Sequence, residues 1–213
     1  MIANIKPVVA SNVHATEIAS KWIKRWSHLV KPEGVVLDVA CGAGRHARWF
    51  EALNCKLVLV DRSQEAIDFL ALQSNKYEAV VSDLENAPWP FAGRFFDAVV
   101  VTNYLWRPLM PTLLGSLAPF GVLLYETFTQ GNETVGKPSR PDFLLRTGEL
   151  LGMCKDLRVV AFEEGFLAGS DGKSLRFVQR IAAIREPSGE IVETTETALA
   201  VPKVTKPHRY SLI

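Results

Sequence analysis

Short apolar runs alternate with helical stripes from residue 35 onward. The runs are apolar at consecutive positions, which is typical of a strand that is buried on both faces. Between them, apolar positions recur at i, i+3, i+4 and i+7, as expected for one face of a helix. This alternation predicts a parallel sheet covered by helices on both faces. The predicted strands are 35–40, 57–60, 79–81, 98–101 and 122–125, and the first helical stripe is His46, Trp49, Phe50 and Leu53.

Helix starts can also be predicted from single residues. Ser63 is suited to cap a helix, with Glu65 in its first turn, where the positive end of the helix dipole favours an acid. Pro111 suits the first turn of another helix, because its missing N–H would be unpaired there. Before the sheet, Ile18, Trp22, Trp26 and Leu29 predict an amphipathic helix over residues 12–31.

The last two apolar runs, 157–162 and 175–184, predict an antiparallel hairpin. Only twelve residues join them, too few for a crossover helix, and these contain the turn pair Asp171-Gly172. After residue 185 the sequence loses periodicity and gains Pro, Thr and charge. We therefore expect one domain over residues 1–185, with its core at 35–185, and a poorly ordered or docking tail at 186–213.

Composition narrows the function classes. The chain has 213 residues, 48% of them hydrophobic, and a formal net charge of +1, so attraction to nucleic acid or membrane surfaces is not a property of the whole chain. No apolar stretch approaches the ~20 residues that span a bilayer, and residues 1–12 lack a secretory apolar core, so we expect a cytoplasmic location. We also expect a monomer or homodimer, with its three cysteines reduced.

The segment VVLDVACGAGRHARWF places two glycines between a strand and a helix. Gly42 and Gly44 let the chain turn sharply and let a ligand approach the backbone, because a Cβ there would collide with it. The same turn matches the dinucleotide fingerprint G-x-G-x-x-A, so the glycines alone do not select a cofactor.

Three acids in or just after the first three strands bear on the choice of cofactor. Asp61 alone would equally serve NAD, so Asp38 and Asp83 together decide the choice. Asp38 would repel a pyrophosphate and attract an ammonium or sulfonium. Asp61 can accept hydrogen bonds from both ribose hydroxyls, and Asp83 can accept one from the adenine amino group, with Leu84 beside the ring. S-adenosylmethionine carries both cations and no phosphate, so these residues predict it as the cofactor. We add Arg62, next to Asp61, to the cofactor-binding set.

These residues lie in motifs that resemble the class I S-adenosylmethionine-dependent methyltransferases over about residues 30–185. VLDVACGAGRH is similar to the first motif, LVLVDRS to the second, VVSDLEN to the third, and FDAVVVTNYL to the strand below the reaction site. The resemblance implies a doubly wound, Rossmann-like α/β fold with a seven-stranded sheet of order 3-2-1-4-5-7-6 and an antiparallel strand 7. Ala40 departs from the fullest first motif, which has Gly there. NYLWRPL and the residues after the fifth strand resemble a bacterial subgroup near the tellurite-resistance methyltransferases.

Candidate reaction-site residues follow the fourth and fifth strands, where ligands bind in open α/β sheets. We expect Asn103 to touch the methionyl part of the cofactor and Tyr104 to line the path of the methyl group; alternatively, they cap a turn and pack. Arg107 could hold an anionic acceptor, and Glu126 is the best single candidate for a base. The alternative for both is a structural ion pair.

The long connection 129–146 has the length and the glycines of a lid. Lys137, Arg140 and Arg146 would give it a positive lining suited to an anion; alternatively, it is a solvated surface loop. Among the other chemically capable residues, Cys41 and His46 are expected to be packed rather than reactive.

The leading hypothesis is a methyltransferase that acts on a small-molecule acceptor by in-line transfer, without a metal. A second hypothesis takes RNA or protein as acceptor, because Lys21, Lys24, Arg25 and His28 form a basic stripe on the first helix, although such a stripe is usually a solvated face. A third is a cofactor-binding module that does not catalyse. An NAD(P)-dependent oxidoreductase is the alternative at the level of the fold, disfavoured by Asp38.

Overall fold

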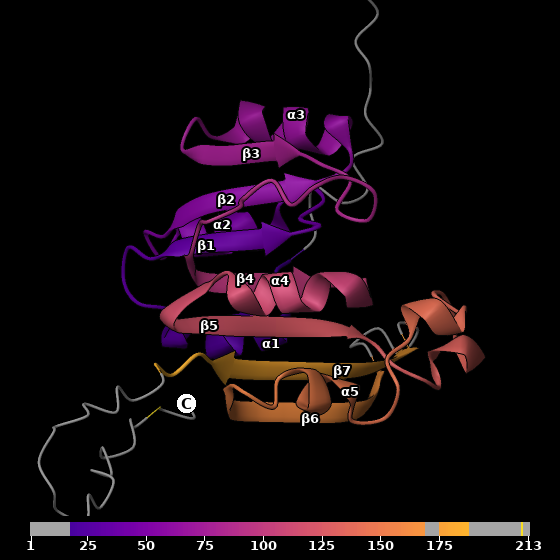
Figure 1. Ribbon diagram of the computed structural model, residues 1–213. Coiled ribbons are helices and arrows are strands. Elements are labelled where there is room, and N and C mark those ends of the chain that lie inside the picture. The colour runs from indigo at the N-terminus through magenta and orange to yellow at the C-terminus, as the bar shows by residue number, and fades with distance from the viewer. Residues whose placement is uncertain (1–17, 169–174, 188–209, 211–213) are drawn as a thin grey trace, which may run out of the picture.

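The computed structural model describes residues 18–168, 175–187 and 210. They form a seven-stranded sheet of order β3-β2-β1-β4-β5-β7-β6 (Figure 1). β1 to β5 are parallel, and β7 is antiparallel to both of its neighbours. The predicted fold class and strand order are therefore confirmed. The strands are β1 Val35–Val39, β2 Lys56–Asp61, β3 Tyr77–Val81, β4 Phe96–Thr102, β5 Leu117–Phe128, β6 Arg158–Ala168 and β7 Leu175–Ile184.

Helices cover both faces of the sheet (Figure 1). α1, α2 and α3 pack on one face, and α4 and α5 pack on the other, each over a separate cluster of buried apolar side chains. The helices are α1 Lys21–Trp26, α2 Arg45–Glu51, α3 Gln64–Gln73, α4 Met110–Gly115 and α5 Glu149–Met153. Short 3-10 turns are η1 Ser27–Leu29, η2 Arg107–Leu109, η3 Asn132–Thr134 and η4 Pro141–Phe143. No helix of the described residues has the length and apolarity needed to cross a membrane.

The strands form where the sequence predicts them because both of their faces are covered. Along β1, Val36 points to the α1–α3 face, whereas Leu37 and Val39 point to the α4–α5 face, and all three are fully buried. The predicted helix starts are also confirmed. The Ser63 hydroxyl accepts a hydrogen bond from the Ala66 N–H at 3.2 Å, and Pro111 lies in the first turn of α4.

Helix boundaries differ from the sequence expectation. Of the helix predicted over 12–31, residues 12–17 lie outside the described part, and α1 begins only at Lys21, because the Ser20 hydroxyl caps it by accepting from the Trp22 N–H. Ile18 precedes this cap and is 75% exposed, so its assignment to the core stripe is wrong. The same holds for Leu53, which follows α2 and is 41% exposed.

The closing hairpin is confirmed, with β6 extending to Ala168, beyond the predicted end at 162. Its predicted turn, Asp171-Gly172, lies outside the described residues. Of the tail, the structure describes 186, 187 and 210. The Tyr210 hydroxyl donates to Glu186 Oε1 at 3.2 Å, and the Tyr210 side chain packs against the apolar cluster under α1.

Candidate functional site

The glycine turn after β1 is built from left-handed residues. Gly42 and Gly44 have φ angles of +52° and +71°. A Cβ on Gly44 would lie 2.3 Å from Leu70 Cδ2, so this glycine permits α2 to pack closely against α3. A Cβ on Gly42 would meet no atom within 4 Å, so its backbone borders open space that a ligand can approach. The two glycines therefore differ: Gly44 permits close helix packing, whereas Gly42 borders open space.

Ala40 explains why the related motif favours glycine at its position. Its φ is +52°, a left-handed conformation that costs an L-residue about 1–2 kcal/mol. Ala40 lies on the wall of the cavity described next, so this strain is stored directly beside the site.

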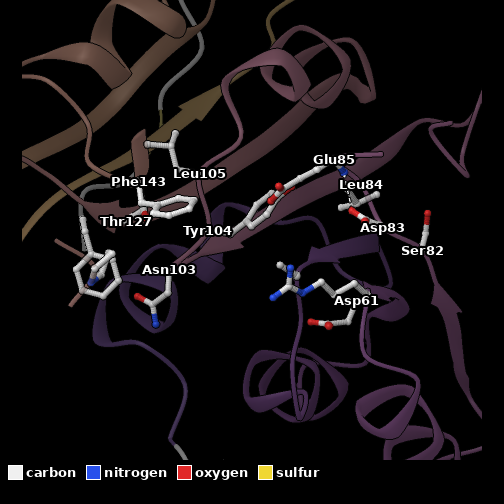
Figure 2. Close-up of a pocket in the computed structure, with 14 residues that line it drawn as sticks. Asp61, Ser82, Asp83, Leu84, Glu85, Asn103, Tyr104, Leu105, Thr127 and Phe143 are labelled. Carbon is white, nitrogen blue, oxygen red and sulfur yellow. Dashed lines mark hydrogen bonds between the residues drawn. The ribbon is translucent and has the colours of Figure 1, made fainter. Parts of the chain in front are cut away.

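A cavity of about 390 Å³ opens at the carboxyl ends of the parallel strands. Figure 2 shows its two ends with Tyr104 between them. The first, here named the acidic end, follows β2 and β3 and is formed by Asp61, Arg62, Ser82, Asp83, Leu84 and Glu85. The second, named the ring end, follows β4 and β5 and is formed by Leu105, Thr127, Phe128, Pro138 and Phe143. Ala40 and Asn103 complete the wall.

Asp61 is fixed by the backbone around it. Its Oδ2 accepts from the Gly42 N–H at 2.8 Å and its Oδ1 accepts from the Ser63 N–H at 2.9 Å. These bonds tie the glycine turn to the end of β2 and hold the carboxylate at the cavity wall.

Asp83 is also locked in place. Its carboxylate accepts from the Asn86 side-chain amide at 2.9 Å and from the Glu85 N–H at 3.0 Å. These bonds, that of Asn86 first, lower the pKa of Asp83. With Glu85 on the same wall, the acidic end has three carboxylates, whereas Arg62 is the one basic side chain among the described residues of the wall.

Asp38 lies below this cavity rather than on its wall. It is 2% exposed on the α1–α3 face of β1, and its Oδ2 has no hydrogen-bond partner among the described residues. Burial raises the pKa of Asp38 to about 7, with Asp61 adding to the rise and Arg45 opposing it. The ring of His46 lies 3.8 Å from Oδ2.

His46 is packed, as the sequence predicts. Burial, reinforced by Arg45 and Arg48, lowers the pKa of His46 to about 3, so the ring is neutral. The Ser20 N–H donates to its Nε2 at 3.4 Å. Cys41 is likewise buried and free, and burial raises the pKa of its thiol far above the usual range. Neither residue is poised for catalysis.

Asn103 and Tyr104 lie on the wall between the two ends. Asn103 adopts a left-handed φ of +54°, and its N–H donates to the Glu126 carbonyl at 3.0 Å. The Tyr104 hydroxyl is buried without a hydrogen-bond partner among the described residues. Burial, with the charges of Glu85 and Asp83, raises the pKa of Tyr104 to about 12. The hydroxyl therefore stays protonated, and no described residue uses its hydrogen-bonding capacity.

The structure places Glu126 away from the cavity, in an ion-paired network. Its side chain is 1% exposed and points to the α1 face, where it accepts from the Ser20 hydroxyl at 3.1 Å and from Arg180 at 3.1 Å. Arg176 approaches to 4.0 Å, and Arg180 also pairs with Glu163 at 2.9 Å. The geometry favours a structural ion pair over the expected catalytic base.

Arg107 is also engaged in structural contacts. Its guanidinium pairs with Glu149 at 2.6 and 2.9 Å and donates to the carbonyls of Asp142 and Leu144 at 2.8 Å. These bonds fix the end of the 129–146 connection, and Arg107 is absent from the cavity wall. It therefore supports the lid instead of holding an anionic acceptor.

The connection 129–146 contributes Pro138 and Phe143 to the cavity wall, as expected for a lid. Its expected positive lining is wrong, because none of its basic side chains is on the wall. Arg140 is exposed and pairs with Asp142 at 3.0 Å, and Lys137 and Arg146 are also exposed. The lid presents an apolar surface to the cavity.

Sequence reasoning missed part of the wall. Glu85 directly follows Asp83 and Leu84, so the third motif, VVSDLEN, already contained this acid. Thr127 and Phe128 were missed because β5 was predicted to end at 125, whereas it extends to Phe128. No group of three or more potential metal ligands occurs within the described residues.

Comparison with known proteins supports the assignment of the fold. Residues 36–119 match the family model described as a methyltransferase domain. This part of the chain is therefore similar to a methyltransferase domain. No curated protein sequence matches the chain.

Solved structures share the fold of this chain. TehB from Haemophilus influenzae is 18% identical in sequence and superimposes with a TM-score of 0.67. The match covers 80% of this chain and 63% of the TehB chain. A TehB-like methyltransferase from Corynebacterium glutamicum is 15% identical, with a TM-score of 0.57, and the match covers 82% of this chain and 92% of that one. Coclaurine N-methyltransferase, bound to N-methylheliamine and S-adenosylhomocysteine, is 15% identical, with a TM-score of 0.53. That match covers 67% of this chain and 48% of the coclaurine enzyme. The chain thus spans less than two thirds of the Haemophilus protein.

Proposed function

We propose that this protein transfers a methyl group from S-adenosylmethionine to a small-molecule acceptor held at the ring end. The observation that carries the proposal is the single cavity that joins an acidic end to a ring end past Tyr104. The cofactor supplies an electrophilic methyl group on a cationic sulfur. The protein contributes binding, alignment and exclusion of water, which suffice for an acceptor that is already nucleophilic.

The residues of the acidic end fit this cofactor. Asp61 would accept from the ribose hydroxyls, Asp83 from the adenine amino group, and Leu84 would pack beside the ring. Gly42 leaves backbone space for the methionyl part, and the unpartnered Oδ2 of Asp38 is an acceptor that an ammonium would satisfy. The acidic end has three carboxylates and one arginine, so it would repel the pyrophosphate of a dinucleotide. This disfavours the NAD(P)-dependent oxidoreductase alternative.

The remaining proposed residues position the acceptor. Asn103 would contact the methionyl part, and Tyr104 would line the path of the methyl group between the two ends. Phe143 and Pro138 of the lid would cover the acceptor and shield it from water. Arg107 would act indirectly, by holding the lid in place. Glu126 would also act indirectly, by anchoring β5 to α1 through Ser20.

A small acceptor is favoured over RNA or protein. Two residues of the basic stripe are engaged within the chain: Lys24 lies 4.8 Å from the Trp49 ring, and Arg25 lies 5.0 Å from the Trp26 ring and 3.6 Å from Glu163. The structurally similar coclaurine N-methyltransferase carries a small molecule, N-methylheliamine. The cavity of about 390 Å³ would also hold the cofactor, so the space left for an acceptor at the ring end is that of a small molecule.

Release of S-adenosylhomocysteine from S-adenosylmethionine tests this function. The full chain is incubated with fractions of a small-molecule extract, and release that depends on a fraction is expected. Tight S-adenosylhomocysteine binding without release from any small-molecule, RNA or protein fraction would instead support the binding-module alternative. The fraction that triggers release also separates a small acceptor from a macromolecular one.

Cofactor affinity is expected to depend on pH through Asp38. Because burial raises its pKa to about 7, Asp38 is mostly protonated below pH 7, and a bound ammonium requires the ionised form. Affinity for S-adenosylhomocysteine should therefore fall about tenfold from pH 8 to pH 6. His46, with its pKa near 3, does not change charge in this range.

Isothermal titration at pH 6, 7 and 8 measures this dependence. The Asp38→Asn variant, which cannot ionise, should show a weaker and flat affinity over the same range. A wild-type affinity that is constant with pH, or a variant that retains the fall, would show that Asp38 does not face the ligand.

A further inference from the structure

We infer that the ring end selects amine acceptors with an apolar body and rejects anionic ones. The inference rests on the proposed function, because it takes the ring end as the acceptor site. It starts from the charges and surfaces that the described cavity wall presents to a molecule beside Tyr104.

The wall offers an anion no partner at this end. Among the described residues, the ring end consists of Leu105, Thr127, Phe128, Pro138 and Phe143, none of which is charged. Arg62 is the one described cation on the wall, and it belongs to the acidic end, where its charge helps to keep Asp83 ionised.

Three arginines outside the cavity wall are already paired. Arg107 is held by Glu149 and two carbonyls, Arg140 pairs with Asp142, and Arg180 bridges two glutamates. Recruiting any of them to an anion would leave a carboxylate without its partner. A carboxylate or oxyanion bound at the ring end would therefore lose its hydration without gaining a cationic partner, which is unfavourable.

The same wall suits a cation. Asp83 and Glu85 of the acidic end both act electrostatically on Tyr104, and the opposing effect of Arg62 is smaller than that of either acid. The rings of Tyr104, Phe128 and Phe143 lie on the wall and can stack on an apolar body or face an ammonium. The buried Tyr104 hydroxyl has no hydrogen-bond partner among the described residues, so its oxygen can accept from an N–H.

Binding of three matched probes tests the inference without relying on turnover. 2-Phenylethylamine, 2-phenylethanol and phenylacetate share a ring and differ mainly in charge. They are titrated calorimetrically into the full chain saturated with S-adenosylhomocysteine. We expect the amine to bind about tenfold or more tightly than the carboxylate, with the alcohol between them.

The outcomes separate this inference from the proposed function. A chain that fails to bind S-adenosylhomocysteine contradicts the proposed function itself. If S-adenosylhomocysteine binds but phenylacetate equals or exceeds the amine, or the amine shows no binding, the inference is overturned and the proposed function stands.

Two variants locate the source of the preference. Glu85→Gln should reduce the amine-to-carboxylate ratio severalfold, whereas Asp156→Asn, an exposed acid before β6 at the opposite edge of the sheet, should leave it unchanged. Tyr104→Phe keeps the ring and should weaken the amine and the alcohol more than the carboxylate. Thermal unfolding of each variant verifies folding. An unchanged ratio in Glu85→Gln would rule out the acidic wall as the cause.

Discussion

Replacement of Glu126 by alanine is expected to lower the free energy of unfolding by about 3 kcal/mol, the lower end of what removal of one partner from a buried ion pair costs. Glu126 is 1% exposed and holds Arg180 and the hydroxyl of Ser20, the cap of α1. Its loss would leave the Arg180 guanidinium, whose side chain is 14% exposed, with Glu163 alone. Urea unfolding of variant and wild type measures the difference.

Glu78→Ala is the matched control for this substitution. Glu78 also forms an ion pair, with Arg94, but both side chains are exposed, so its removal should cost less than about 1 kcal/mol. Equal effects for the two variants would contradict the stabilising role of the Glu126 network. The isosteric Glu126→Gln variant tests the alternative role: a folded protein that binds cofactor but has lost turnover would restore Glu126 as a base.

Replacement of Asp61 by alanine is expected to weaken S-adenosylhomocysteine binding by about 2–3 kcal/mol, or roughly 30- to 150-fold. The carboxylate would lose charge-assisted hydrogen bonds to the ribose. It would also release the Gly42 N–H, so that the glycine turn loses its tie to β2. Isothermal titration at pH 8, where Asp38 is mostly ionised, isolates this effect.

Asp68→Ala provides the comparison. Asp68 is an exposed acid on α3 that contacts Gln64 and is absent from the cavity wall, so its removal should leave affinity unchanged. A loss of less than about twofold in Asp61→Ala, with folding intact, would show that Asp61 serves the turn and not the ligand.

The parts of the fold that depend on local pattern were predictable from the sequence. Consecutive apolar residues such as those of β1 form strands because both faces are covered, and Ser63 and Pro111 mark helix starts by their own hydrogen-bonding chemistry. The strand order came from the resemblance in motifs, not from periodicity. The start of α1 was missed because the Ser20 cap sets it, and the end of β6 because its pairing with β7 sets it. Neither feature is visible in the apolar pattern.

The candidate site was predictable only in part, because position along a strand does not give the direction of a side chain. Asp38 and Glu126 both stand at or near strand ends, yet both point to the face covered by α1 and α2. The partners that decide this, Arg180 for Glu126 and Glu149 for Arg107, lie 54 and 42 residues away in the sequence. The connection 129–146 contributes Pro138 and Phe143 to the cavity wall, but its basic side chains are exposed to solvent.

The central claim is that the acidic end of the cavity binds a positively charged, phosphate-free nucleoside. Calorimetric titration of the wild-type chain with S-adenosylmethionine, NADH and ATP tests it most directly, because all three carry adenosine and differ in charge. The account predicts binding of S-adenosylmethionine and none of NADH or ATP under the same conditions. Binding of NADH or ATP with equal or greater affinity would contradict it.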